Sequence, residues 1–275
     1  MTNLKNNYKN YHHPLVIIIL LIIASLPTIV WMSDRWFAQG SYYSHGVLVP
    51  FVSLFLIYQK KEIIKKIPLV ESVWGLWLFM LGVVIYCLSA VMHVYFSSAF
   101  AMLLITSGLI LHFYGEKVFK ELLFPLTFLV FMIPLPLIVV SFICFKLKII
   151  AAQIATFVLN AIGLHAIRLS SIIKMQHCDI LVEDSCGGLR SLISLMALGS
   201  IFAYQLRSSF PPKMLFFIST IPIATITNAF RIVFISAIGE MLGTEYTQGF
   251  LHELSGYLVF GFAFVLLYLV KKLLE

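Results

Sequence analysis

Long runs of apolar residues constrain the fold of this chain more than any other feature of its sequence. A helix needs roughly 20 mostly apolar residues to cross a bilayer. Eight runs of about this kind are present: Pro14–Ser33, Gly46–Tyr58, Val73–Met92, Ser97–Tyr114, Leu122–Phe142, Gly188–Leu206, Met214–Ile235 and Ser255–Val270. The second is short, and Pro134 and Pro136 should kink or end the fifth. We therefore predict an all-α integral membrane protein of about eight transmembrane helices, forming one domain over residues 1–275.

The composition agrees with this fold class and argues against a nucleic-acid partner. Charged residues make up 11% of the chain and hydrophobic residues 61%, whereas ordinary globular chains carry about 25% charged residues. The net charge of +7 comes from Lys and Arg residues that are scattered between apolar runs and form no basic stripe. Basic residues at the ends of apolar runs are typical of membrane topology signals, so the expected partner is the lipid bilayer.

The placement of basic residues predicts an orientation. With a cytoplasmic N-terminus, twelve of the 19 Lys and Arg residues fall on the cytoplasmic side. The clearest inside loop is Lys60–Lys66, which reads K-K-E-I-I-K-K. Because cytoplasmic loops carry the excess of Lys and Arg, we predict that both termini are cytoplasmic and that the chain crosses the membrane many times.

The longest segment on the outer side covers residues 143–186. Its first part, Lys146–Ile162, has an apolar stripe interrupted by polar residues and predicts an amphipathic helix at the membrane interface. Its second part has two short β-rich runs, around Ile172–Ile173 and Ile180–Val182. We predict a small extracytoplasmic β-hairpin there, immediately before the sixth span.

Cys186 is the strongest candidate for chemistry, within the sequence E-D-S-C-G-G-L-R-S. Gly187 and Gly188 permit a tight turn into a helix, and the helix N-terminus together with Arg190 would favour the thiolate. A thiolate is the nucleophilic form of cysteine. The alternatives are a buried cysteine beside a flexible turn, or a disulfide with Cys178, which would disable the nucleophile.

Arg231 and His252 are expected on the same membrane face as Cys186. Asn228 lies three residues before Arg231, so both project from one helical face, and an arginine there can hold an oxyanion or simply snorkel to the interface. His252 is suited to general acid–base work, or is an ordinary loop histidine. Gly256 interrupts a zinc-protease pattern, so we predict no metal site and no cofactor.

Together these motifs resemble the exosortase/archaeosortase family of membrane cysteine transpeptidases, over most of the chain from about Tyr42 to the eighth span. The cysteine motif of that family, A-C-S-G followed by a leucine-arginine-serine stretch, maps onto Ser185–Ser191. Its N-x-x-R motif maps onto Asn228 and Arg231. Its late H-x-x-x-G motif maps onto His252 and Gly256.

Two further observations bear on the resemblance. The stretch Tyr43–Pro50, with His45, is similar to the S-H-G signature of bacterial members. Gly187 stands where serine is usual, which puts the local hydrogen bonding in doubt while the three candidate catalytic residues remain.

The resemblance implies an enzyme at the outer face of a bacterial inner membrane, with its active site facing the periplasm. Its substrates would be membrane-anchored proteins with a C-terminal sorting signal, which has a short motif (Pro-Glu-Pro in many cases), a transmembrane helix and a basic cluster. Cys186 would attack, Arg231 would stabilise the oxyanion and His252 would move protons, with transfer to an unidentified acceptor. We expect the hairpin to help clamp the extended substrate by strand addition.

Two other functions stay open at the level of sequence. A non-enzymatic component of exopolysaccharide export or transport would suit discontinuous helices and buried charges, although no internal repeat is visible. An intramembrane protease that hydrolyses without transfer would use the same acyl-enzyme, so the sequence alone does not separate it from a transpeptidase.

Overall fold

The computed structural model describes residues 12–182, 188–243, 245 and 250–274. The chain divides into two compact units, residues 1–39 with 44–134 and residues 40–43 with 135–275. The prediction of one membrane domain over the whole chain stays a prediction.

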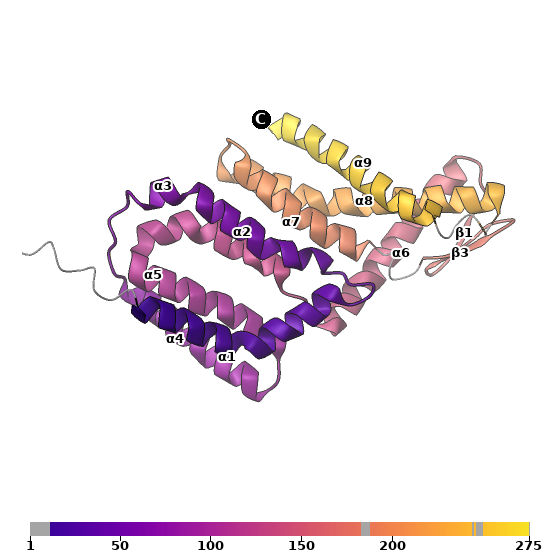
Figure 1. The fold of residues 1–275 in the computed structure, drawn as a ribbon. Coiled ribbons are helices and arrows are strands. Elements are labelled where there is room, and N and C mark those ends of the chain that lie inside the picture. Colours follow the sequence, from indigo (N-terminus) through magenta and orange to yellow (C-terminus); the bar gives the residue numbers. More distant parts are fainter. Residues whose placement is uncertain (1–11, 183–187, 244, 246–249, 275) are drawn as a thin grey trace, which may run out of the picture. The chain divides into compact units, whose positions relative to one another are not determined.

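The first unit is entirely helical within the described residues (Figure 1). Its elements are α1 (His12–Phe37), η1 (Ser44–Val47), α2 (Leu48–Gln59), α3 (Lys61–Ile64), α4 (Val73–Val91), α5 (Tyr95–Phe128) and η2 (Leu129–Met132). Helices α4 and α5 lie side by side, and a Cβ at Gly75 or Gly108 would clash with the backbone of the opposing helix. Small residues at such crossings let membrane helices approach closely.

Helix α5 contains a break at Gly115, whose φ of 80° and ψ of 176° are not helical. The break separates the predicted fourth span from the fifth. The helical path then ends at Met132, and a new helix begins at Leu137. Pro134 lies between them and Pro136 caps the new helix, so the predicted fifth span is divided between two helices, as expected of proline.

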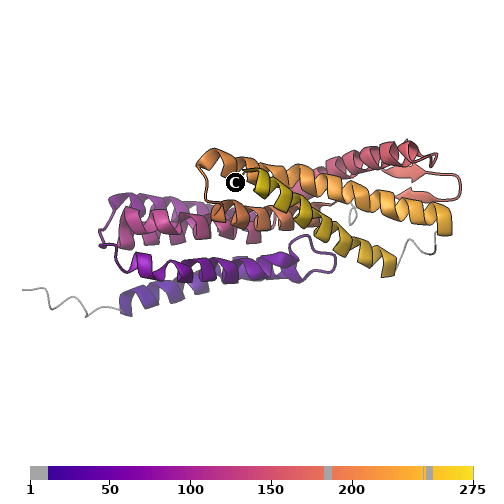
Figure 2. The same cartoon turned by 90° about the horizontal axis from the view of Figure 1, so that it is seen from above.

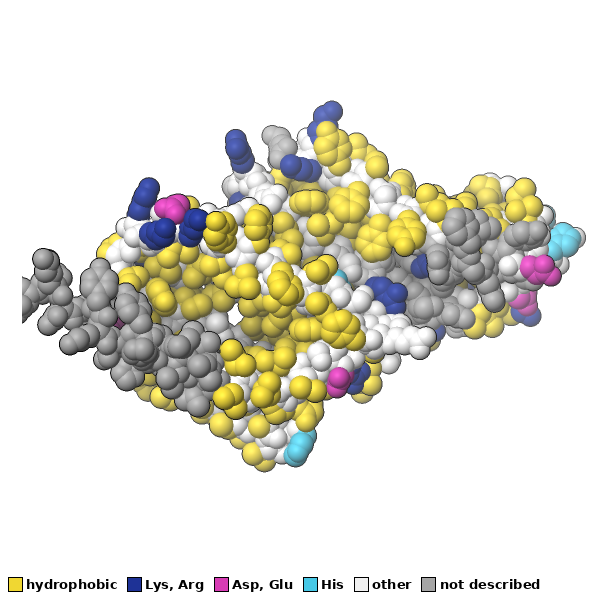
Figure 3. Space-filling model, viewed as in Figure 1, with side chains coloured by type: hydrophobic (Ala, Val, Ile, Leu, Met, Phe, Trp, Pro, Cys, Tyr) yellow, Lys and Arg dark blue, Asp and Glu magenta, His cyan; other side chains and the backbone are white. Residues whose placement is uncertain are grey.

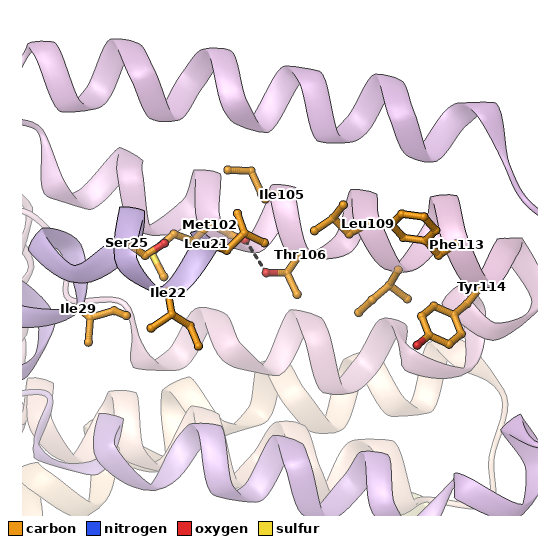
Figure 4. Close-up of a pocket in the computed structure, with 11 residues that line it drawn as sticks. Leu21, Ile22, Ser25, Ile29, Met102, Ile105, Thr106, Leu109, Phe113 and Tyr114 are labelled. Atoms are coloured by element: carbon orange, nitrogen blue, oxygen red, sulfur yellow. Dashed lines mark hydrogen bonds between the residues drawn. The ribbon is translucent and has the colours of Figure 1, made fainter. Parts of the chain in front are cut away.

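An apolar groove of about 410 Å³ lies between α1 and α5 in this unit (Figure 4). Side chains such as Ile22, Leu109 and Phe113 line it, and the hydroxyl of Thr106 donates to the carbonyl of Met102 within it, at 2.8 Å. None of the candidate site residues lines this groove.

The second unit combines four helices with a small sheet (Figures 1 and 2). Its elements are α6 (Leu137–Ala161), β1 (Ile167–Leu169), β2 (Ile172–Lys174), β3 (Asp179–Leu181), α7 (Leu189–Gln205), α8 (Phe210–Leu242) and α9 (Phe250–Leu274). Helix α8 packs against α6, α7 and α9 and is the centre of this unit.

Helix α6 contains almost all of the segment Lys146–Ile162, for which an amphipathic helix was predicted, and extends it toward the N-terminus; its position at the membrane interface stays a prediction. It begins at Leu137, has 25 residues, and is apolar enough to cross a membrane by length and composition. The two lysines in its middle suggested a surface position. Lys146 is exposed, whereas Ala151, Ala152 and Ala155 are buried in the core of the unit.

Five helices in the described part of the chain meet the length and hydropathy of a membrane span. They are Val73–Val91, Tyr95–Met132, Leu137–Ala161, Phe210–Leu242 and Leu254–Leu274, with two shorter apolar helices at Ser44–Gln59 and Leu189–Gln205. Hydrophobic side chains cover most of the visible helical surface (Figure 3). The chain is therefore a mostly helical membrane protein, while the number of eight spans stays a prediction.

The sheet has three antiparallel strands in the order β1-β2-β3. Strands β2 and β3 correspond to the hairpin that the sequence predicted, and β1 is an addition. Ile173 and Val182 are buried, at 0% and 1% exposure, in one cluster with Ile232 of α8 and the α6 alanines. One face of the sheet is thus packed on α6 and α8.

Candidate functional site

Gly188 is the N-cap of helix α7, and its φ of 83° and ψ of 3° are left-handed. Its carbonyl accepts hydrogen bonds from the backbone N–H of Leu192 at 2.9 Å and the hydroxyl of Ser191 at 2.8 Å. A Cβ at position 188 would lie 2.8 Å from both Cγ and Nδ2 of Asn228. Glycine is required here on two grounds, because the backbone is left-handed and α8 approaches closely.

Asn228 is buried, with 2% of its surface exposed, although it lies in an apolar stretch of α8. Leu147, Ala151 and Ala224 surround it, and the remaining void has no room for a water molecule. A buried amide in such surroundings is costly unless it is hydrogen-bonded. The tight packing fixes the start of α7 against one face of α8.

Arg231 lies one turn further along α8 and contacts α9. Its Nε donates a hydrogen bond of 3.0 Å to Oγ of Ser255, which is 1% exposed. Both residues line a groove of about 310 Å³ between α8 and α9. The groove is lined by Thr227, Phe230, Arg231, Phe234, Ser255, Leu258, Val259 and Phe262. A cation in an apolar groove interacts with other charges more strongly than it would in water.

His252 belongs to the first turn of α9, three residues before Ser255. The side chain of His252 lies outside the described part of the structure, so its place beside Arg231 stays a prediction. Cys186 and Gly187 lie outside the described residues. Among the described residues, Gly188 packs against Asn228, and Arg231 contacts Ser255.

Three supporting residues from the sequence motifs are placed differently. Arg190 is exposed in the first turn of α7. A Cβ at Gly256 would meet nothing within 4 Å, so close packing does not require glycine there. His45 belongs to η1 of the first unit, where the neighbouring Gly46 packs against the indole of Trp36.

The end of α8 anchors the sheet through Glu240. Its carboxylate accepts a hydrogen bond of 3.0 Å from the backbone N–H of His177 and lies 2.9 Å from Nδ1 of the same residue. The thiol of Cys178 also donates a hydrogen bond to the carboxylate of Glu240. Burial, reinforced by the nearby carboxylate, raises the pKa of this thiol from 9.0 to about 11. Cys178 is a free cysteine and stays protonated at neutral pH.

Sequence reasoning missed both Ser255 and Glu240. Ser255 is a small polar residue in an apolar run, one turn after His252, and this spacing was the available signal. Glu240 is an acidic group near a helix C-terminus, which is unfavourable without a partner. Within the described part of the chain, no three His, Cys, Asp or Glu side chains come together as metal ligands would.

The model of the family described as "Transmembrane exosortase (Exosortase_EpsH)" matches residues 31–269, which is most of the chain. The chain belongs to the transmembrane exosortase family. This confirms the resemblance predicted from the motifs. No curated protein and no solved structure shows significant similarity to the chain. Exosortase membership supports a membrane transpeptidase-type role in general.

Proposed function

We propose that this exosortase is a cysteine transpeptidase that cleaves C-terminal sorting signals of the Pro-Glu-Pro type at the outer face of the bacterial inner membrane. The observation that carries the proposal is the packing of Gly188 against Asn228, on the helix that holds Arg231. It holds the chain just after the candidate nucleophile against the helix that carries the candidate oxyanion donor.

Cys186 is the proposed nucleophile. Two residues of chain span at most about 7 Å, so Cys186 is tethered within that distance of Gly188 and of the N-terminus of α7. The positive end of a helix dipole favours a thiolate. Cys178 is unsuited to this role, because its pKa of about 11 keeps the thiol protonated.

Arg231 is the proposed oxyanion donor. Ser255 holds Nε, which orients the planar guanidinium. The apolar lining of the groove lowers the local dielectric, so the charge stabilises a developing oxyanion more than it would in water. The donor is fixed before the reaction begins.

The proposed reaction has two halves. The thiolate of Cys186 attacks the scissile carbonyl carbon, and the electron pair moves to the oxygen, which Arg231 stabilises. Collapse restores the carbonyl and breaks the C–N bond, and the leaving amine takes a proton from His252. An acceptor nucleophile then gives its proton to His252 and attacks the thioester, which releases the thiolate.

The length of α8 supports an outer-face site. A helix of 33 residues is about 50 Å long, which exceeds the roughly 30 Å hydrocarbon core. Lys213 is near its start, and Arg231 lies roughly 27 Å further along the helix axis. With Lys213 at the cytoplasmic boundary, Arg231 reaches the opposite boundary, where a substrate's own helix can approach laterally through the bilayer.

The test is an intact-mass measurement on a secreted reporter that carries a Pro-Glu-Pro sorting tail and is co-expressed with the exosortase. We expect a reporter truncated near the motif and joined to an acceptor mass. A free carboxyl terminus would instead show a hydrolysing protease. A full-length reporter in cells that contain inserted exosortase would contradict the proposal.

A further inference from the structure

Strand β3 forms one edge of the three-stranded sheet within the described residues. The backbone N–H of Val182 donates to the carbonyl of Ser171 at 2.9 Å, and Ile180 is the register partner of Ile173. Hydrogen-bonded and non-hydrogen-bonded pairs alternate in an antiparallel ladder. Ile180 therefore directs its backbone groups toward β2, whereas Asp179 and Leu181 direct theirs away from the sheet.

The edge is exposed but rigidly held. The side chain of Leu181 is 56% exposed, and Asp179 is also exposed. On the other face, Val182 packs in the same cluster as Ile232, the residue after Arg231. Glu240 fixes the turn that precedes β3. The backbone donors and acceptors of the edge therefore have a defined position relative to α8.

We propose that the outer edge of β3 (Asp179–Leu181) binds the extended segment of the sorting signal beside the scissile bond by strand addition. This inference rests on the proposed function. An exposed edge is a template for a further strand, and main-chain hydrogen bonds then supply affinity. Because β3 leads within five residues to Cys186, a substrate strand paired with it follows the chain toward the nucleophile.

The structure favours this occupant and this edge over the alternatives. Strand β3 has three residues, and Asp179 pairs with Lys174 at 3.7 Å. Short edges that carry charged side chains resist pairing between identical copies. On the opposite edge, β1 directs outward only the backbone groups of Arg168, by the same alternation. Only β3 offers two residues with outward donors and acceptors and continues toward Cys186.

The first test is Leu181→Pro, with Arg168→Pro as the matched control on the other edge. Each substitution removes one outward N–H, and proline is tolerated on an edge strand when that N–H faces away from the ladder. Leu181→Pro loses one backbone hydrogen bond to the substrate, so this variant should process the substrate about 5-fold more slowly than wild type. Arg168→Pro should process at the wild-type rate. Equal rates for both variants, at wild-type membrane levels, would overturn the proposal.

The second test uses the wild-type enzyme, so it does not depend on whether Leu181→Pro folds. Each substrate peptide in this test carries one N-methylated amide at a different position of the extended segment. Methylation should impair cleavage at every second position, because alternate N–H groups of the substrate face the edge. If methylation at every position impaired cleavage equally, strand addition would be excluded. A photoreactive group at Leu181 that captures a second copy, and not the substrate, would also overturn it. If wild-type enzyme cleaves no unmodified substrate, the proposed function itself fails.

Discussion

Gly188→Ala should destabilise the junction between α7 and α8. The left-handed backbone at position 188 costs an L-residue about 1–2 kcal/mol. The added Cβ would lie 2.8 Å from two atoms of the Asn228 side chain, and overpacking of this kind costs about 1–3 kcal/mol. The two effects together predict a loss of about 2–5 kcal/mol.

Thermal unfolding of the purified protein in detergent measures this loss. For a chain of this size, each kcal/mol of lost stability lowers Tm by about 2–4 °C, so Gly188→Ala should lower Tm by roughly 4–20 °C. Gly261→Ala is the matched control, because a Cβ at that position in α9 meets nothing within 4 Å. If Gly188→Ala is as stable as Gly261→Ala, the argument that α7 begins tightly against Asn228 is refuted.

Three further predictions follow from the site and the topology. Arg231→Lys should slow processing by about 100-fold or more, because an ammonium cannot reproduce the planar fork of the guanidinium. Ser255→Ala should slow processing only several-fold. Equal rates for Arg231→Lys and wild type in a cleavage assay would contradict the role of Arg231. Cys178, with its pKa of about 11, should react with iodoacetamide at pH 7.5 about 100-fold more slowly than an ordinary thiol and speed up as pH rises; rapid labelling at neutral pH would disprove its protonated state. A reporter fused after Lys66 should show cytoplasmic activity, and periplasmic activity would overturn the orientation.

The sequence predicted those parts of the fold that depend on local patterns. Apolar runs of sufficient length correspond to helices such as Val73–Val91, and Pro134 and Pro136 mark the place where one helix ends and the next begins. The β-branched runs of β2 and β3 were recognisable for the same reason. Each of these features is decided by residues close together in the chain.

The features that escaped prediction depend on distant contacts. Strand β1 is three residues long and exposed along its length, so only its pairing with β2 defines it. The buried face of α6, with Ala151 and Ala155, is defined by its contacts with the sheet and α8. In the site, Arg231 meets Ser255 across 24 residues of sequence. The motifs predicted the candidate residues, whereas their partners come from the packing of α8 against other elements.

In the proposed mechanism, Cys186 forms a covalent acyl-enzyme with the substrate. The most direct measurement is cleavage of the sorting-signal reporter in cells that express Cys186→Ala, with the amount of inserted variant matched to wild type. We expect full-length reporter and no processed product in these cells, while Cys178→Ala in parallel yields product at a rate close to that of wild type. Processed reporter in the Cys186→Ala cells would contradict the cysteine mechanism and favour a non-enzymatic role in export or transport.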